Sequence, residues 1–462
     1  VAFFAITSIG AIAVPLNAWW QAQELRYGLD NAGARLLICD GERYQKIAPL
    51  RDMLPDLADI WVARATPPFV DAEALEALIG APGDYTSLPD QDLPSVAIHP
   101  DDEATLFYTS GTTGFPKGAT LSHHNILNNG FFVAEIMNFG GEDRLIVPVP
   151  LYHCFGMVMG NLGCLSHGAC VIYPAEGFEP EAVLRAVELE RATALYGVPT
   201  MFIAELALPI FSDFDLSSLR TGIMAGAPCP IETMTQVNEL MHMTEVEIAY
   251  GMTETSPVSF QTRVDSPLDK RVSTVGTVHP HVEVKIIDAD SGRICSVQEM
   301  GELCTRGYSV MLGYWNKPEA TAAAMIDGWF HTGDIVRRAP DGAMYFVDRK
   351  KNVIRRSGGL LLAVIANRLR RTMRQDDLIA RIGGDEFVAL LNDLHDPNDA
   401  ALIASKIIHT LSEPITLSGH HLLVSASVGI ATYPSHGSTA AELLQHADQA
   451  LYRAKANGRN GY

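Results

Sequence analysis

The chain has 462 residues, of which 47% are apolar and 19% charged, and a formal net charge of −20 at pH 7. This composition describes a soluble acidic protein and argues against general nucleic-acid binding, so any anionic ligand needs local positive groups. The length suggests about three domains of ~150 residues. The seven cysteines show no metal-ligand spacing and suggest reduced thiols in a cytoplasmic protein.

The first 16 residues are apolar, as in a signal or membrane segment. No basic residue precedes this stretch, it is shorter than the ~18 residues that cross a membrane, and Pro15 interrupts it. We therefore expect no transmembrane segment, and a first segment that lies within a buried helix.

Strands and helices alternate along most of the chain, which is the pattern of an α/β fold. Ser122 is an expected helix N-cap. Short strands at 282–288 and 301–305 and a hairpin at 342–354 follow this alternating region. Within it, apolar runs predict strands at 145–149, 170–173, 194–198 and 247–249, and helices are predicted at 122–137, 180–190 and 231–241.

Residues 106–118 read LFYTSGTTGFPKG and join an apolar strand to a loop of glycines and hydroxyl side chains with one lysine. Glycines let backbone amides approach an anion, hydroxyl groups donate hydrogen bonds, and Lys117 adds a positive charge. The run is not a Walker A loop, because Pro116 precedes Lys117 and Gly118 follows it. We predict a phosphate site formed by Thr109, Ser110, Gly111, Thr112, Thr113, Gly114 and Lys117.

This run resembles the signature of the AMP-forming adenylate synthetases, which comprise acyl-CoA synthetases, peptide-synthetase adenylation domains and luciferases. Residues 250–254 (YGMTE) resemble the family's second core motif. The resemblance implies that Tyr250 packs on the adenine, Thr253 bonds the α-phosphate and Glu254 holds Mg²⁺. These roles suit the residue types, because Mg²⁺ takes few carboxylates together with phosphate oxygens and an aromatic face suits a purine.

Two further segments resemble parts of the family's nucleotide site. Residues 225–228 (AGAP) resemble the loop that lines the adenine and acyl sites, which implies roles for Ala225 and Gly226. Residues 329–334 (WFHTGD) resemble the ribose motif, in which Asp334 would accept hydrogen bonds from both ribose hydroxyls. Taken alone, Asp334 is also compatible with closing a turn.

Residues 348–354 (DRKKNVI) resemble the family's hinge motif, which implies that Arg349 lies near the ribose and that Lys351 is the swivel residue. A solvated basic hairpin is the alternative interpretation of this run. Residues 150–156 (PLYHCFG) also match the family, and there His153 would gate the acyl tunnel. Without that context, His153 would be read as a core residue beside aromatic side chains.

The resemblance implies an adenylate-forming large domain with α/β subdomains and a β-rich subdomain, and a two-step reaction. A carboxylate attacks the α-phosphate of ATP and expels pyrophosphate, and the thiol of CoA then attacks the acyl-adenylate. The amino-acid sequence of residues 223–230 and 241–261 is most similar to that of medium- and long-chain fatty acyl-CoA synthetases. The implied cofactors are ATP, Mg²⁺ and CoA, and the implied substrate is a fatty acid. The protein supplies positioning and charge stabilisation, and the expected catalytic residues are Lys117, His153, Thr253 and Glu254.

The resemblance to this family covers residues 1–357. We expect the front of the family's large domain to lie outside the sequence before Val1. The family's small C-terminal domain, whose lysine contacts the reacting carboxylate, does not follow the hinge. We expect these losses to impair the activity.

The composition changes after residue 357, where no Trp or Cys occurs. This part has nine Lys and Arg residues and ten Asp and Glu residues, so the acidic excess belongs to the first module. Residues 378–387 (LIARIGGDEF) read as two short strands around a Gly-Gly turn with two acids at its tip. This string resembles the signature of GGDEF domains, which are diguanylate cyclases. The resemblance implies a c-di-GMP product site at Arg374 and Asp377, contacts of Lys455 and Arg459 with the phosphates of GTP, and metal binding by Asp385.

Only part of that domain is present too, because its opening strand, which carries the other metal-binding Asp, is absent. A two-metal phosphoryl site with half its carboxylates does not hold its ions. We therefore expect an adenylate-forming domain at 1–357 joined to the C-terminal part of an α+β GGDEF domain at 358–462.

The primary function expected is a fatty acyl-CoA synthetase-like ligase. One alternative is a GGDEF signalling module that makes or binds c-di-GMP, and another is a chimeric gene product without native function. A homodimer stays open, and nucleic acid is not an expected partner.

Overall fold

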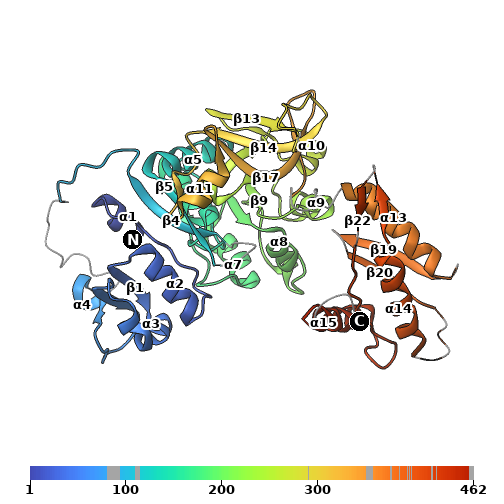
Figure 1. The fold of residues 1–462 in the computed structure, drawn as a ribbon. Coiled ribbons are helices and arrows are strands. Elements are labelled where there is room, and N and C mark those ends of the chain that lie inside the picture. The colour runs from blue at the N-terminus through green and yellow to red at the C-terminus, as the bar shows by residue number, and fades with distance from the viewer. Residues whose placement is uncertain are drawn as a thin grey trace. The chain divides into compact units, whose positions relative to one another are not determined.

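The computed structural model describes residues 1–80, 94–109, 115–289, 291–349, 357–374, 377–383, 386–392, 394, 396, 398–417, 420–422 and 424–456. The chain divides into two compact units, which we call unit 1 (residues 1–347) and unit 2 (residues 348–462). Figure 1 draws both as ribbons. The domain boundary between residues 357 and 358 stays a prediction.

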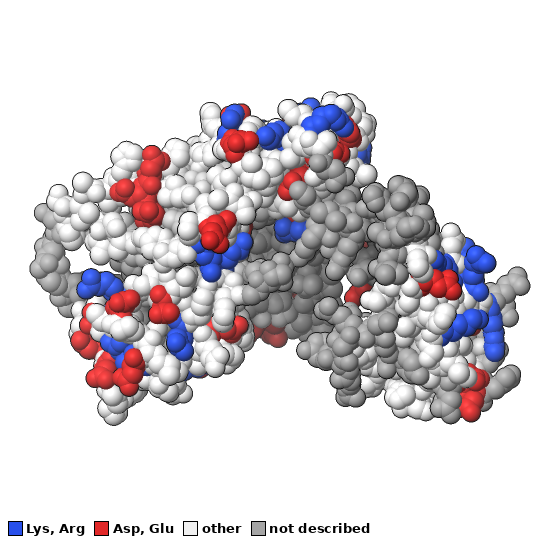
Figure 2. Space-filling view, in the orientation of Figure 1, with Lys and Arg blue, Asp and Glu red and all other residues white. Residues whose placement is uncertain are grey.

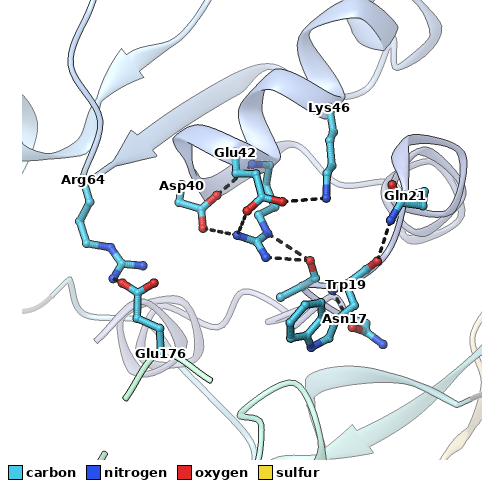
Figure 3. Close-up of polar contacts among 10 residues, drawn as sticks. Asn17, Trp19, Gln21, Asp40, Glu42, Lys46, Arg64 and Glu176 are labelled. Atoms are coloured by element: carbon cyan, nitrogen blue, oxygen red, sulfur yellow. Dashed lines mark hydrogen bonds and ion pairs between the residues drawn. The ribbon is translucent and has the colours of Figure 1, made fainter. Parts of the chain in front are cut away.

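Unit 1 begins with helix α1 and a small parallel sheet. Asp40 caps α3 (Gly41–Ile47) by accepting a hydrogen bond from the Arg43 amide at 2.9 Å, and the Arg43 guanidinium donates to the Ala18 carbonyl at 3.1 and 3.0 Å. Figure 3 shows Asp40 in this region, together with an exposed ion pair between Arg64 and Glu176. The elements are α1 (Ala2–Ser8), α2 (Ala22–Ala32), β1 (Leu36–Asp40), α3 (Gly41–Ile47), η1 (Ala48–Met53), β2 (Asp59–Ala63), β3 (Glu73–Ala74) and α4 (Leu75–Ile79), with strand order β1-β2-β3.

Helix α1 lies at the surface rather than in the core. Only Thr7 is buried within it, and Phe4 is 39% exposed. Phe3 packs against the apolar cluster that contains Phe107. The expectation of a buried first helix is therefore wrong, because one face of this short helix meets the core and the other faces solvent.

The centre of unit 1 is a seven-stranded sheet in the order β12-β11-β10-β9-β8-β6-β7. Neighbouring strands from β7 to β10 are parallel, whereas β11 and β12 are antiparallel to their neighbours. The strands are β6 (Arg144–Ile146), β7 (Cys170–Ile172), β8 (Ala194–Gly197), β9 (Thr221–Ala225), β10 (Glu245–Gly251), β11 (Val258–Gln261) and β12 (Thr277–Val278).

Helices cover both faces of this sheet. One apolar cluster joins it to α7 (Pro180–Glu190), α8 (Pro199–Leu206) and α9 (Ile231–Leu240). Another joins it to α5 (His123–Ile136), the π-helical segment η3 (Phe155–Leu162) and α6 (Gly163–His167). Ser122 caps α5, as predicted, by accepting a hydrogen bond from the Asn125 amide at 3.1 Å. The α/β architecture predicted for this region is confirmed.

Two antiparallel sheets complete unit 1. In the first, β15 (Gly313–Tyr314), β5 (Lys117–Ser122) and β4 (Glu103–Thr109) pair in that order. In the second, β13 (Val282–Ile287), β14 (Met300–Gly307), β17 (Trp329–Arg338) and β16 (Met325–Ile326) pair in that order, and β18 (Met344–Arg349) pairs with β17. The remaining helical segments are η4 (Phe211–Asp213), η5 (Thr253–Thr255), α10 (Leu268–Ser273) and α11 (Pro318–Ala324).

Unit 2 contains three helices and two short hairpins in the described part of its chain: α13 (Ser357–Thr372), β19 (Leu378–Gly383), β20 (Glu386–Leu390), α14 (Asn398–Ser412), β21 (Ile415–Leu417), β22 (His420–Leu422) and α15 (Ala440–Ala456). Leu369, Ile407 and Leu411 form its small core. β19 and β20 form the predicted hairpin.

None of the helices in the described ranges of either unit is long and apolar enough to cross a membrane. Acidic and basic side chains are interspersed on the face of unit 1 drawn in Figure 2.

Candidate active site

Most of the predicted nucleotide-site residues belong to unit 1. The structure describes Thr109, Lys117, His153, Ala225, Gly226, Tyr250, Thr253, Glu254 and Asp334 there. Arg349, Arg374 and Asp377 belong to unit 2, and Arg349 is the last residue of β18. Ser110, Gly111, Thr112, Thr113, Gly114, Lys351, Asp385 and Arg459 lie outside the described residues, as does the side chain of Lys455 on α15.

Lys117 and Glu254 meet through a tyrosine. The Lys117 ammonium lies 3.9 Å from the centre of the Tyr314 ring. The Tyr314 hydroxyl donates a hydrogen bond to Oε1 of Glu254 at 2.8 Å. Burial, with the Glu254 carboxylate beside it, raises the pKa of Tyr314 well above its ordinary value, so the phenol stays protonated and can donate. The structure thus brings together a predicted phosphate residue and the predicted magnesium ligand.

Tyr250 and Asp334 are in direct contact. The Tyr250 hydroxyl donates to Oδ2 of Asp334 at 2.6 Å, although 84 positions separate the two residues. Tyr250 is half-buried and directly follows the buried residues of β10, while Asp334 is 1% exposed on β17. The ring centre of Phe346 lies 6.0 Å from that of Tyr250. A carboxylate thus lies beside two aromatic rings, which is the combination that a ribose and a purine require.

The turn after Tyr250 is fixed by local geometry. The pairing of β10 with β11 shifts register between Tyr250 and Gly251, and the chain then enters η5, which holds Thr253 and Glu254. A Cβ at Gly251 would lie 1.8 Å from the carbonyl oxygen of Pro257, so only glycine fits there. This close approach sets where Thr253 and Glu254 leave the sheet.

The predicted phosphate loop connects two paired antiparallel strands. Thr109 at the end of β4 lies opposite Lys117 at the start of β5. On the far side of the loop, the Tyr27 hydroxyl donates to the Pro116 carbonyl at 2.9 Å, and the Tyr27 ring stacks on Phe115 with the ring centres 4.6 Å apart. Helix α2 therefore holds the end of the loop that leads into Lys117.

Ala225 and Gly226 lie where β9 ends, and Ala225 is buried within the apolar cluster on the α5 side of the sheet. His153 lies before η3 with its ring centre 4.7 Å from that of Tyr152. Although the His153 side chain is exposed, desolvation by the surrounding protein lowers its pKa below the ordinary value. The imidazole is therefore neutral at pH 7.

A metal at this site would have few protein ligands. No group of three or more His, Cys, Asp or Glu side chains in the described ranges could hold an ion. Glu254 offers one carboxylate, whose Oε1 is bonded to Tyr314. A single carboxylate completed by phosphate oxygens and water suits Mg²⁺, so the donor set fits a nucleotide-bound Mg²⁺ and does not fit a metal cage built by the protein alone.

In unit 2, the carboxylate of the predicted product site accepts hydrogen bonds from nearby backbone. One carboxylate oxygen of Asp377 accepts from the Arg374 amide at 2.9 Å, and the other accepts from the Asn392 amide at 3.3 Å. The Asp377 carboxylate thus binds backbone amides after α13, at Arg374, and after β20, at Asn392, while the Arg374 side chain is exposed.

The sequence interpretation missed Tyr314 and Tyr27. The aromatic pair in the Gly-Tyr-Trp run at 313–315 was the available signal for Tyr314. Tyr27 carries no motif, and its contact with Pro116 spans 89 positions. Only the fold reveals these contacts.

A family model described as AMP-binding enzyme matches residues 1–315. The chain belongs to this family. A second model, described as diguanylate cyclase, GGDEF domain, matches residues 355–461. Both resemblances read from the sequence are therefore confirmed, and the chain combines them.

Related proteins are similar over the same share of the chain. YngI of Bacillus subtilis is 42% identical over 379 residues, which are 77% of this chain and 68% of that protein. The acyl-CoA ligase sidI of Aspergillus fumigatus is 41% identical, over 77% of this chain and 62% of that protein. The human mitochondrial medium-chain acyl-CoA ligase ACSF2 is 35% identical, over 77% of this chain and 61% of that protein. The chain thus spans between 61% and 68% of the length of these relatives.

Solved structures show the same fold. The anthranilate CoA ligase AuaEII in complex with anthranoyl-AMP superposes with a TM-score of 0.67 at 27% identity, covering 76% of this chain and 65% of that one. The inhibitor-bound N-terminal domain of FACL13 from Mycobacterium tuberculosis gives a TM-score of 0.65 at 26% identity, covering 75% of this chain and 82% of that one. The adenylate-forming fold predicted for the first module is confirmed.

Proposed function

We propose that unit 1 activates a carboxylic acid with ATP and Mg²⁺ to form an acyl-adenylate, for transfer to CoA. The observation that carries the proposal is convergence: Tyr250 contacts Asp334, and Lys117 and Glu254 contact the same tyrosine. Membership of the AMP-binding enzyme family and the acyl-CoA ligase names of the relatives support the same chemistry.

Each residue has a definite part in this proposal. Asp334 accepts hydrogen bonds from the ribose hydroxyls, and Tyr250 packs on the adenine. Lys117 and the hydroxyl of Thr253 hold phosphate oxygens as a substrate carboxylate oxygen attacks the α-phosphorus and pyrophosphate leaves. Such sites accelerate the reaction by positioning and by stabilising charge.

Glu254 is the residue that would hold Mg²⁺, and the bound ion supplies charge neutralisation on the phosphate oxygens. The remaining predicted nucleotide residues are Thr109, Ser110, Gly111, Thr112, Thr113, Gly114, Ala225, Gly226, Arg349 and Lys351.

The acyl group is proposed to be a medium- or long-chain fatty acid. The names of the ACSF2 relatives specify medium-chain substrates for those proteins. Neutral His153 at the predicted gate is compatible with an apolar chain, because an uncharged imidazole costs less to desolvate than an imidazolium. CoA as the acceptor, a cytoplasmic location and a homodimer stay predictions.

Calorimetric titration of the chain with ATP and Mg²⁺ tests the proposal. We expect Asp334→Ala and Glu254→Ala each to lower the affinity by about tenfold or more, since each removes a charged hydrogen-bonding or metal-binding group. Asp377→Ala is the matched control, because it removes an aspartate of unit 2, and it should bind ATP like the wild type. Equal affinities for all four proteins would contradict the proposal.

A second candidate function belongs to unit 2, where the GGDEF model matches residues 355–461. Residual binding of c-di-GMP through the exposed Arg374 is the form that this function would take, since a guanidinium fork can grip a phosphate or a guanine edge without metal. Synthesis of c-di-GMP from GTP through Asp385, Lys455 and Arg459 is not expected.

A further inference from the structure

We propose that Tyr314 is a positioning residue that holds the Glu254 carboxylate at its hydroxyl and the Lys117 ammonium over its ring, where they would receive a magnesium-bound nucleotide. The inference rests on the adenylation function proposed above. Its basis is that one phenol serves both charged groups: the hydroxyl donates to Oε1 of Glu254 at 2.8 Å, and the ring centre lies 3.9 Å from the Lys117 ammonium. Tyr314 therefore acts on the site through these two residues.

The backbone of Tyr314 is fixed to the strand that carries Lys117. In the pairing of β15 with β5, Tyr314 lies opposite Ala119, two residues from Lys117. The amides on either side bond the same strand: Leu312 donates to the Thr120 carbonyl at 2.9 Å, and Trp315 donates to the Gly118 carbonyl at 2.8 Å. The ring is thus held in register with Lys117.

The same segment is also tied to the turn that carries Glu254. The Met311 amide donates to the Glu254 carbonyl at 3.0 Å. The Tyr314 amide donates to Oγ1 of Thr321 at 2.9 Å, which links β15 to α11. Tyr314 is only 8% exposed, so its ring has little freedom to turn. The segment from Met311 to Trp315 therefore connects the phosphate strand with the magnesium turn.

The neutral Tyr314 phenol lies between the opposite charges of Lys117 and Glu254 and keeps both available to a ligand. Among the contacts of the described residues, Lys117 lies over the Tyr314 ring, and the hydroxyl of that ring occupies one oxygen of the Glu254 carboxylate. A direct pair would neutralise both groups and turn them away from a ligand. The phenol instead leaves the ammonium available to phosphate oxygens and Oε2 of Glu254 available to a cation, because a cation–π contact is weaker than a desolvated ion pair.

The test is Tyr314→Phe, which keeps the ring under Lys117 and removes the hydrogen bond to Glu254. ATP binding is measured by calorimetry over a series of Mg²⁺ concentrations and in EDTA. We expect the Mg²⁺ concentration for half-maximal enhancement of ATP binding to rise about tenfold, as for loss of a hydrogen bond to a charged group, while affinity in EDTA changes by less than about twofold.

Tyr308→Phe is the matched control. Tyr308 lies three residues before the segment from Met311 to Trp315 and is half-buried, but its hydroxyl accepts a hydrogen bond from Asn129 at 3.4 Å and does not contact the site. A merely structural role would make both variants alike, with lower thermal stability and an unchanged Mg²⁺ requirement. That result would overturn the proposal.

A double variant isolates the route through Glu254. If Tyr314 acts by orienting that carboxylate, Tyr314→Phe should change the Mg²⁺ requirement by less than about twofold in a Glu254→Gln background, because coupled residues are not additive. Additive effects would overturn the proposal even though ATP binding persists. Absence of ATP–Mg²⁺ binding by the wild type would instead refute the adenylation function, and this inference with it.

Discussion

In unit 1, Tyr250 meets Asp334 across 84 positions of sequence and Tyr314 meets Glu254 across 60, whereas in unit 2 the Asp377 carboxylate bonds the backbone amides of Arg374, three positions away, and Asn392, 15 positions away. The contacts of unit 1 join side chains from elements that are distant in the sequence: β10 with β17, and β15 with η5. Those of unit 2 join one carboxylate to backbone amides at Arg374 and Asn392. Predicted site residues of unit 1 thus contact other side chains, whereas the predicted Asp377 of unit 2 binds backbone amides.

The difference also appears in how polar groups are buried. Every buried polar or charged residue among those that the structure describes lies in unit 1. Burying a polar group costs free energy unless the group is hydrogen-bonded. A larger domain buries a larger fraction of its surface, so unit 1 can offset that cost better than a small domain can. Unit 2, with a core of Leu369, Ile407 and Leu411, is a smaller body.

Two glycine substitutions, one in each unit, should have the largest effects on stability and should separate the two units by their effect on ATP binding. A Cβ at Gly251 would lie 1.8 Å from the Pro257 carbonyl oxygen, and one at Gly429 would lie 1.9 Å from the Ala447 carbonyl oxygen. We expect each alanine variant to lose about 3 kcal/mol of stability in its own unit, since backbone cannot yield as a side chain does. Only Gly251→Ala should abolish ATP binding, because it displaces Tyr250 and Thr253.

Differential scanning calorimetry combined with ATP titration measures both effects. Gly177→Ala is the control, because a Cβ there meets nothing within 4 Å. Wild-type ATP affinity in Gly251→Ala would show that the turn after Tyr250 does not form the nucleotide site.

The second prediction concerns acid sensitivity. His279 is buried, and its Nε2 lies 3.0 Å from Oε1 of Gln261, whose amide donates to the Glu247 carboxylate at 2.6 Å. Burial, with Arg263 nearby, lowers the pKa of His279 to about 3, whereas burial raises the pKa of Glu247. The unfolded chain therefore binds a proton at His279 as the pH falls through about 6.5, and the folded chain does not.

Between pH 7 and pH 5 this histidine lowers the free energy of unfolding by about 2 kcal/mol, and the Glu247 effect has the opposite sign. We expect His279→Gln to remove the histidine contribution, so that its stability falls about 2 kcal/mol less than that of the wild type over this range. Urea unfolding at both pH values measures the difference, with the exposed His281→Gln as the matched control. An identical pH dependence in His279→Gln and the wild type would contradict the assignment.

Much of the local structure was predictable from the sequence. The helix predicted at 180–190 has those bounds as α7, and Ser122 caps α5 as expected. These elements depend on caps and periodicity that lie within a few residues. The family motifs could be recognised because each of them also lies within a few consecutive residues.

What could not be predicted depends on distant pairing. Tyr314 meets the site because β15 pairs with β5, whose residues lie about two hundred positions earlier, and no local pattern encodes that register. The exposure of α1 was also missed, since apolar composition alone does not say how many of a helix's faces are covered. The chemistry of single residues was thus predictable from the sequence, whereas their contacts with distant residues were visible only in the fold.

The most direct test of the account is product analysis of one reaction that contains the full chain, ATP, GTP, Mg²⁺ and fatty acids of medium and long chain length. Mass spectrometry should detect acyl-adenylate from the wild type, a strongly reduced amount from Asp334→Ala, and no c-di-GMP from either. Formation of c-di-GMP that Asp385→Ala abolishes, without any acyl-adenylate, would show that unit 2 and not unit 1 carries the working site.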